Sequence, residues 1–134
     1  MVITVNMKQL TGFLALFLFA SLALYAADLS DLTITTSGGQ VTITHFDGGA
    51  TGELFISDTI QGNPVTSIGD ESFSRCWGLT NITISNGVSS IGSSAFSGCT
   101  ALTRITLRGN APTFGWDVFL NLATGARAYE NVSW

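Results

Sequence analysis

Apolar positions recur with a period of 23 residues through the middle of the chain. The segment VTSIGDESFSRCWGLTNITISNG, residues 65–87, is followed at once by VSSIGSSAFSGCTALTRITLRGN, residues 88–110. The positions that match in kind pair Val65 with Val88, Ile68 with Ile91, Gly69 with Gly92, Phe73 with Phe96, Ser74 with Ser97, Cys76 with Cys99, Leu79 with Leu102, Thr80 with Thr103, Ile82 with Ile105 and Ile84 with Leu107. A unit this short cannot bury its apolar side alone, so successive copies must stack around one elongated core. The pattern therefore predicts a solenoid.

Each copy holds two extended segments joined by a turn. The longer segment has apolar residues two positions apart, as at Ile82 and Ile84, which is the alternation of a strand. Stacked copies of this strand form a parallel sheet. The shorter segment ends at Ile91-Gly92, where glycine permits a backbone bend. The residues Ser93 to Phe96 that follow combine a capping-type serine with turn formers, and one helical turn is expected there.

A different pattern precedes the repeats. Residues 29–46 alternate between apolar and polar on either side of Ser37-Gly38-Gly39, which predicts a β-hairpin. Because the first end of a solenoid needs an atypical unit to cover it, residues 28–52 are interpreted as an N-terminal cap. The repeat array then begins with the strand at residues 54–56 and is assigned residues 53–129. Extra residues between Ser57 and Pro64 are absorbed as a loop insertion.

The last part of the chain repeats the pattern less faithfully. Phe114-Gly115 and Phe119 keep the period, so residues 111–129 are interpreted as a degenerate third copy. Residues 130–134 form a C-terminal tail that offers no polar closing unit, although terminal repeats should present a polar outer face. We expect either that a partner covers this end or that the reading frame is truncated.

The first 27 residues have the composition of a secretory signal peptide. Lys8 precedes an uncharged apolar run from Leu10 to Leu24, and small residues follow it. The run is shorter than the roughly 20 residues that a membrane-spanning helix needs. Cleavage is expected between Ala23 and Ala27, and either Met1 or Met7 can be the true start. The sequence thus predicts a Sec-type leader, export to the cell envelope or medium, and no membrane span after cleavage.

The composition of the mature chain restricts its chemistry. Without the leader, four arginines face nine acidic residues, a balance that lacks the basic footprint of a nucleic-acid binder. His45 is the only histidine, and the chain has no GxSxG, HExxH or GxxxxGK motif. The adjacent pair Asp70-Glu71 is expected to face solvent. We therefore expect no catalytic residues, no cofactor and no metal site.

The repeat motif IGxxxFxxCxxLTxIxI resembles the BspA-like type of bacterial leucine-rich repeat. It is carried here by IGDESFSRCWGLTNITI and IGSSAFSGCTALTRITL. The resemblance implies a leucine-rich repeat solenoid, mainly β with short helical turns, in which parallel strands stack behind an N-terminal β-hairpin cap. Members are mostly exported or surface proteins linked to adhesion and binding. This chain departs from the pattern in having two complete repeats where such arrays often have many.

Cys76 and Cys99 occupy the same repeat position, so stacking at the strand spacing of about 4.8 Å brings them close together. Two interpretations follow. They are two buried free thiols, since free cysteine is among the most buried residue types. Alternatively they form a disulfide, which an exported location permits but which parallel Cβ vectors disfavour. Two thiols without nearby histidines make only half of a zinc site.

The strand alignment places a set of polar and aromatic residues on one outward face. Its three rows run Glu53, Asn81, Arg104, Arg127; then Phe55, Thr83, Thr106, Tyr129; then Ser57, Ser85, Arg108. Because arginine forks match carboxylate and sulfate groups, a ligand-binding patch is predicted. Its residues are Phe55, Asn81, Thr83, Arg104, Thr106, Arg108, Arg127 and Tyr129. The alternative is an ordinary solvated sheet face.

Two functions remain open from the sequence. The first is an exported, non-enzymatic repeat protein that binds a protein or an anionic glycan at the cell surface. The second is structural: a stub or truncated fragment of a larger repeat surface protein, without a ligand of its own and prone to end-to-end self-association. Trp77, Trp116 and Trp134 are candidates for stacking on sugars, and partial packing explains them equally well.

Overall fold

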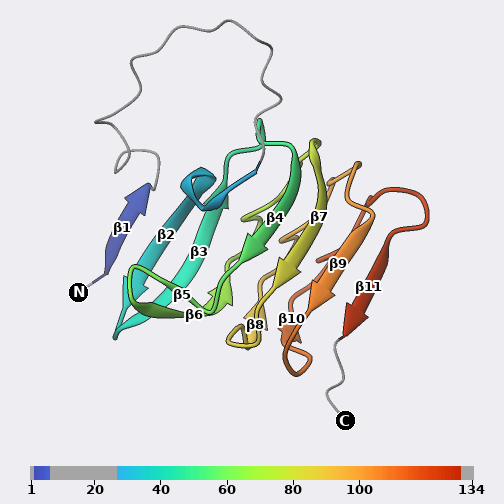
Figure 1. The fold of residues 1–134 in the computed structure, drawn as a ribbon. Helices are drawn as coiled ribbons and strands as arrows, with labels where there is room; N and C mark the ends of the chain where they lie inside the picture. Colours follow the sequence, from blue (N-terminus) through green and yellow to red (C-terminus); the bar gives the residue numbers. More distant parts are fainter. Residues whose placement is uncertain (1, 7–26, 131–134) are drawn as a thin grey trace, which may run out of the picture.

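The computed structural model describes residues 2–6 and 27–130, which form a solenoid of two stacked β-sheets (Figure 1). The four-stranded sheet is wholly parallel and runs in the order β11-β9-β7-β4. Its strands are β4 (Gly52–Ile56), β7 (Leu79–Ile84), β9 (Arg104–Leu107) and β11 (Arg127–Glu130). The predicted solenoid with stacked parallel strands is therefore confirmed.

The seven-stranded sheet forms the other side of the solenoid. Its main path is β1-β2-β3-β6-β8-β10, and β5 pairs with β6 off that path. The strands are β1 (Ile3–Asn6), β2 (Leu32–Ser37), β3 (Gln40–Phe46), β5 (Thr59–Ile60), β6 (Asn63–Ile68), β8 (Ser90–Ile91) and β10 (Thr113–Phe114). The short strands β8 and β10 are the second extended segment of each copy, and they stack in parallel on β6.

The predicted hairpin is present and is continuous with the array. Strand β3 pairs antiparallel with β2 and parallel with β6, where Val41 lies beside Val65 and Ile43 beside Ile68. The 3-10 helix η2 (Leu29–Asp31) precedes β2. Strand β1, from the segment predicted to be a leader, pairs antiparallel with β2. The apolar run of that leader, and residues 131–134 of the tail, lie outside the described residues.

A column of phenylalanines runs through the core at one repeat position. The ring centroids of Phe46 and Phe73 are 5.1 Å apart, those of Phe73 and Phe96 also 5.1 Å, and those of Phe96 and Phe119 6.1 Å. The first three rings are buried, and Phe119 is partly buried. Stacked rings of this kind add to the burial of each ring, so each copy stabilises the next one.

The turn that carries this column is not helical. The prediction of one helical turn over residues 93–96 is wrong, because Ser94 has a φ of 54° in the left-handed region. The equivalent residues Glu71 and Asp117 also have a φ of 54°. In this conformation the turn backbone makes hydrogen bonds to the next copy as well as within the turn: the Phe73 amide donates to the Ala95 carbonyl (2.8 Å), and the Ser97 amide donates to the Ser94 carbonyl (3.0 Å). Stacking therefore outweighs the local helical preference. Among the described residues the one helix is the short η2.

The glycine at the end of the short strand is required by close packing between copies. A Cβ atom on Gly92 would lie 2.5 Å from the backbone nitrogen of Asp70 in the preceding copy. On Gly115 it would lie 2.4 Å from the nitrogen of Ser93. The predicted need for glycine is thus confirmed at Gly92, and its reason is the approach of two backbones rather than a left-handed φ.

Candidate binding face

The outward side of the four-stranded sheet carries the arginines, and we call it the arginine face. The predicted strand register is confirmed throughout this sheet. The first row aligns Glu53, Asn81, Arg104 and Arg127, and the second aligns Phe55, Thr83, Thr106 and Tyr129. Because the copies share one period and their strands pair in parallel, residues that are aligned in the sequence lie side by side in the sheet.

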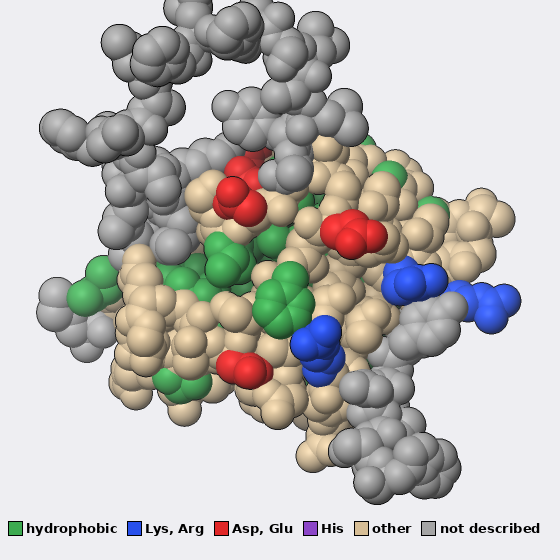
Figure 2. Space-filling view, viewed as in Figure 1, with side chains coloured by type: hydrophobic (Ala, Val, Ile, Leu, Met, Phe, Trp, Pro, Cys, Tyr) green, Lys and Arg blue, Asp and Glu red, His purple; other side chains and the backbone are tan. Residues whose placement is uncertain are grey.

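Most of the predicted patch residues are accessible on this face. Arg104, Arg108 and Arg127 are exposed, and so is Phe55, with 48% of its surface accessible. Asn81, Thr83 and Thr106 are half-buried, and of Tyr129 the structure describes the backbone position alone. Figure 2 shows the basic side chains toward the β9 and β11 side of this face and acidic ones nearer β4. The face is therefore electrostatically divided rather than uniformly cationic.

Two contacts fix side chains across neighbouring strands. The Asn81 side-chain amide donates to Glu53 Oε1 at 2.6 Å, which ties the β4 and β7 ends of the first row together. Arg108 lies with its guanidinium carbon 5.0 Å from the centroid of the Phe55 ring. This cation–π contact bridges β7, because Phe55 is on β4 and Arg108 follows β9. It holds the guanidinium in a defined place while leaving its hydrogen-bond donors available.

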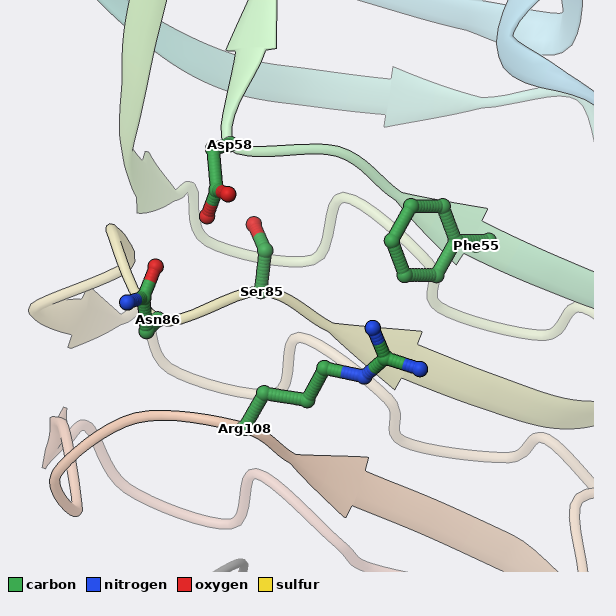
Figure 3. A pocket seen from close by; sticks show the side chains of 5 residues that line it. All are labelled: Phe55, Asp58, Ser85, Asn86 and Arg108. Atoms are coloured by element: carbon green, nitrogen blue, oxygen red, sulfur yellow. The ribbon is translucent and has the colours of Figure 1, made fainter. Parts of the chain in front are cut away.

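A hollow of about 370 Å³ opens at the edge of the arginine face where β4, β7 and β9 end, and we call it the edge pocket. Its lining is polar apart from one aromatic ring (Figure 3). The residues are Phe55, Asp58, Ser85, Asn86 and Arg108. A carboxylate, a hydroxyl, an amide and a guanidinium thus surround a volume large enough for a small molecule.

Ser85 is more buried than its predicted place on the outward face implies. The strand alternation put it on the outward face as a solvated residue, but only 4% of its surface is exposed. Its hydroxyl is the one buried side-chain polar atom without a hydrogen-bond partner in the described part of the chain. Asp58 and Asn86 were not among the predicted site residues either. Asp58 belongs to the loop insertion after β4, which breaks the period and so gave the sequence alignment no equivalent position.

A sequence model that describes a BspA type leucine-rich repeat region of six copies matches residues 21–126. This chain belongs to that family. The BspA-type assignment agrees with the register of both sheets, and it confirms the resemblance drawn from the two complete repeats.

Solved structures of bacterial leucine-rich repeat proteins share the fold. A leucine-rich cell surface protein from Faecalibacterium prausnitzii is 28% identical (TM-score 0.57), over 69% of this chain and 27% of that one. The leucine-rich repeat protein of T. pallidum is 20% identical (TM-score 0.59), over 78% and 64%. One from Bacteroides capillosus is 21% identical (TM-score 0.54), over 75% and 94%. This BspA-type chain thus spans about a quarter of the first protein and under two thirds of the second. No curated protein matches it.

The two cysteines lie inside the solenoid, away from solvent. Cys76 and Cys99 are both fully buried and both free in this structure. The Cys99 thiol donates to the Phe73 carbonyl oxygen at 2.9 Å. A hydrogen bond with Cys99 and burial together raise the pKa of the Cys76 thiol far above its ordinary value, so Cys76 is held neutral. The disulfide stays an untested alternative.

The remaining candidates are distributed over the surface. Trp77 and Trp116 are exposed, by 65% and 85% of their surfaces, and they lie in turns rather than in the edge pocket. Trp134 lies outside the described residues. Within residues 2–6 and 27–130, no three of the His, Cys, Asp and Glu side chains are grouped so as to hold a metal ion. In the same residues, no helix has the length and apolar character to cross a membrane.

Proposed function

We propose that this BspA-type chain is a non-enzymatic binding module displayed at the cell surface, and that its arginine face takes an anionic glycan. The observation that carries the proposal is the placement of charge. Three of the four arginines, Arg104, Arg108 and Arg127, are exposed on one sheet face of a chain whose formal charge is −4. In an acidic protein such a concentration is a local attraction for anions.

The chemistry of the face fits carboxylate and sulfate groups. A guanidinium fork forms two parallel hydrogen bonds to such a group, and its charge makes them stronger than neutral ones. Exposed Phe55 adds an apolar surface beside Arg108 on which a sugar ring can rest. A protein ligand with acidic side chains would use the same donors, so the experiment must separate the two.

The cellular location belongs to the proposal as well. The related protein from Faecalibacterium prausnitzii is described as a leucine-rich cell surface protein. The leader predicted in residues 1–27 supports export by the Sec route. Mass spectrometry of the exported protein tests this directly, and we expect a mature N-terminus between residues 24 and 28. An exported protein that keeps its leader would contradict the cleavage prediction.

The test of ligand binding uses matched arginine variants. The purified chain is applied to an array of anionic and neutral glycans and to acidic peptides, and affinities are then measured by calorimetry. Arg104→Ala and Arg108→Ala should each weaken glycan binding about tenfold to a hundredfold, since a hydrogen bond to a charged group contributes about 1.5–3 kcal/mol. Arg75→Gln removes an equal charge from an exposed turn away from this sheet and should change nothing. Equal losses in all three variants would indicate bulk charge alone and overturn the proposal.

A second function is favoured by the last copy in the described residues, whose outer side we call the open end of the solenoid. Phe114, Trp116 and Leu120 in the third copy are 45%, 85% and 49% exposed. In the preceding copies the amides of the turn donate to carbonyls of the next copy, as Phe96 does to Val118 at 3.0 Å. The described residues hold no fourth copy for the equivalent amide of Phe119. On this account the end stacks on a second copy of the chain, and the protein is a structural repeat unit.

Sedimentation of the purified chain over a wide concentration range separates the two functions. A monomer at all concentrations supports the glycan-binding module. Association that strengthens with concentration supports end-to-end stacking, because an uncapped repeat end presents both apolar surface and unpaired strand edges.

A further inference from the structure

The edge pocket has features that a solvated sheet face does not require. It lies where three parallel strands end, and its volume of about 370 Å³ falls within the roughly 300–1,000 Å³ of small-molecule sites. Its lining brings together side chains from three successive copies: Phe55 and Asp58, Ser85 and Asn86, and Arg108 (Figure 3). Stacking brings these side chains together, and the sequence differences between the copies make them chemically different. Identical copies would place the same residue type at each equivalent position.

The buried Ser85 hydroxyl points to a ligand. A buried hydroxyl without a partner costs free energy, so a fold that needs only a small side chain would not retain it. Other serines of the solenoid have partners: Ser57, at the same repeat position, donates to the Thr59 carbonyl (2.7 Å), and Ser90 donates to Ser67 Oγ (3.0 Å). In Figure 3 the Ser85 hydroxyl points toward the side of the pocket where Asp58 lies. The missing partner is thus expected on the pocket side.

The remaining lining groups define the chemistry of that ligand. Arg108 is steadied over the Phe55 ring and offers a planar pair of donors to a carboxylate. Asp58, when ionised, can only accept hydrogen bonds, so the ligand must also carry donors such as hydroxyl groups. Asn86 can donate or accept. The 48% exposed ring of Phe55 supplies an apolar wall.

We propose that the edge pocket is a subsite for one acidic sugar residue of the uronic acid type. Its carboxylate pairs with Arg108, and its hydroxyls donate to Asp58 and bond to Asn86 and Ser85. An inorganic anion satisfies Arg108 but meets repulsion from Asp58. A neutral sugar leaves Arg108 without a counter-charge. This proposal rests on the proposed function of the arginine face, and it specifies which sugar residue that face selects.

The test uses oligosaccharides of glucuronic acid as probes, with neutral gluco-oligosaccharides and inorganic sulfate for comparison. Calorimetry on the full chain should show binding of the uronate probe only. Asp58→Asn and Ser85→Ala should weaken it about fivefold to tenfold each, which is the loss of one hydrogen bond. Arg108→Lys keeps the charge but loses the fork and should weaken it about tenfold.

Thermal melts recorded on the same variants separate binding from folding. Ser85→Ala should melt at the wild-type temperature or above it, because the substitution removes an unpartnered buried hydroxyl. Ser90→Ala is the matched control: it loses a hydrogen bond on the other sheet, so its melting temperature should fall while uronate affinity stays unchanged. A lower melting temperature for Ser85→Ala with unchanged affinity would overturn the subsite, because it would show a structural hydroxyl.

The outcomes also separate the subsite from the proposed function. Uronate binding that depends on Arg104 and Arg127 but not on Asp58 or Ser85 overturns the subsite and leaves the arginine face standing. Binding of sulfated glycans without uronate binding has the same meaning. No binding of any anionic glycan to the wild-type chain overturns both.

Discussion

The two ends of the phenylalanine column differ, although they hold the same residue at the same repeat position. Phe46 is 1% exposed, while Phe119 is only partly buried. The ring of Phe119 contacts Phe114 edge-on, with centroids 5.5 Å apart, and Phe114 itself is 45% exposed. The stability that a solenoid residue supplies therefore depends on whether copies lie on both sides of it, not on its identity alone.

The difference arises from what covers each end. On the Phe46 side, β2 continues the seven-stranded sheet, and η2 begins with a capping box in which Asp28 and Asp31 satisfy each other's backbone amides. On the Phe119 side, the described chain supplies β11 to one sheet and the two-residue β10 to the other. In the described residues, the first end thus carries elements that the repeats lack, whereas the last copy resembles an interior repeat.

The largest effect should come from removing an interior ring. Phe96→Ala should lower the free energy of unfolding by about 3–5 kcal/mol, because it leaves a cavity between two stacked rings. Phe119→Ala is the matched variant at the open end and should cost about 1 kcal/mol, since its ring is already partly solvated. Urea denaturation measures both. Equal losses would mean that the open end is covered in solution.

A substitution at the repeat glycine should have the next largest effect. Gly92→Ala should cost about 1–3 kcal/mol, because the new Cβ atom meets the Asp70 backbone at 2.5 Å and two copies must separate. Gly69→Ala is the control at the capped end, where the nearest atom is the Ile43 carbonyl oxygen at 3.1 Å. Its smaller clash should cost clearly less by the same urea measurement. A loss at Gly69 as large as that at Gly92 would contradict the packing argument.

Sequence alone predicted the repeat architecture because, in a stacked solenoid, residues one period apart become neighbours on adjacent strands. Once residues 65–87 and 88–110 were aligned, the partners of Arg104 on both neighbouring strands followed, and the register agrees. The conformation of Ser94 could not be predicted in this way. Its own segment is compatible with a helical turn, and hydrogen bonds to another copy decide the outcome.

The edge pocket escaped sequence analysis for a related reason. Alternation assigned Ser85 to the outward face, and it gave no account of the insertion that follows β4. Part of this insertion forms β5, which pairs with β6, and Asp58 at its start lines the pocket with Ser85. The sequence pattern is therefore least informative about structure where the period is broken, and the residues of the candidate binding pocket include one from such a segment.

The cysteines offer a probe of which end opens first. Both thiols are buried, and the raised pKa of Cys76 keeps it neutral, so alkylation of the native chain at pH 8 should be very slow. In urea below the unfolding midpoint, Cys99 should react before Cys76, because it is one copy nearer the open end. Mass spectrometry of the labelled peptides measures the order. Absence of labelling in full denaturant without reductant would instead show a disulfide.

The smallest effect on stability should come from the exposed tryptophan of the third copy. Trp116 is 85% exposed, so Trp116→Ser should change the free energy of unfolding by no more than about 0.5 kcal/mol. If the open end stacks on a second copy, the same change should weaken self-association measured by sedimentation, because an exposed aromatic side chain contributes strongly once it is covered. Trp77→Ser removes a similarly exposed ring from an interior copy and should leave association unchanged. If both substitutions weakened self-association equally, the contact between two copies of the chain would lie on the side of the solenoid rather than at its end. The two ends would then differ in packing but not in their role in association.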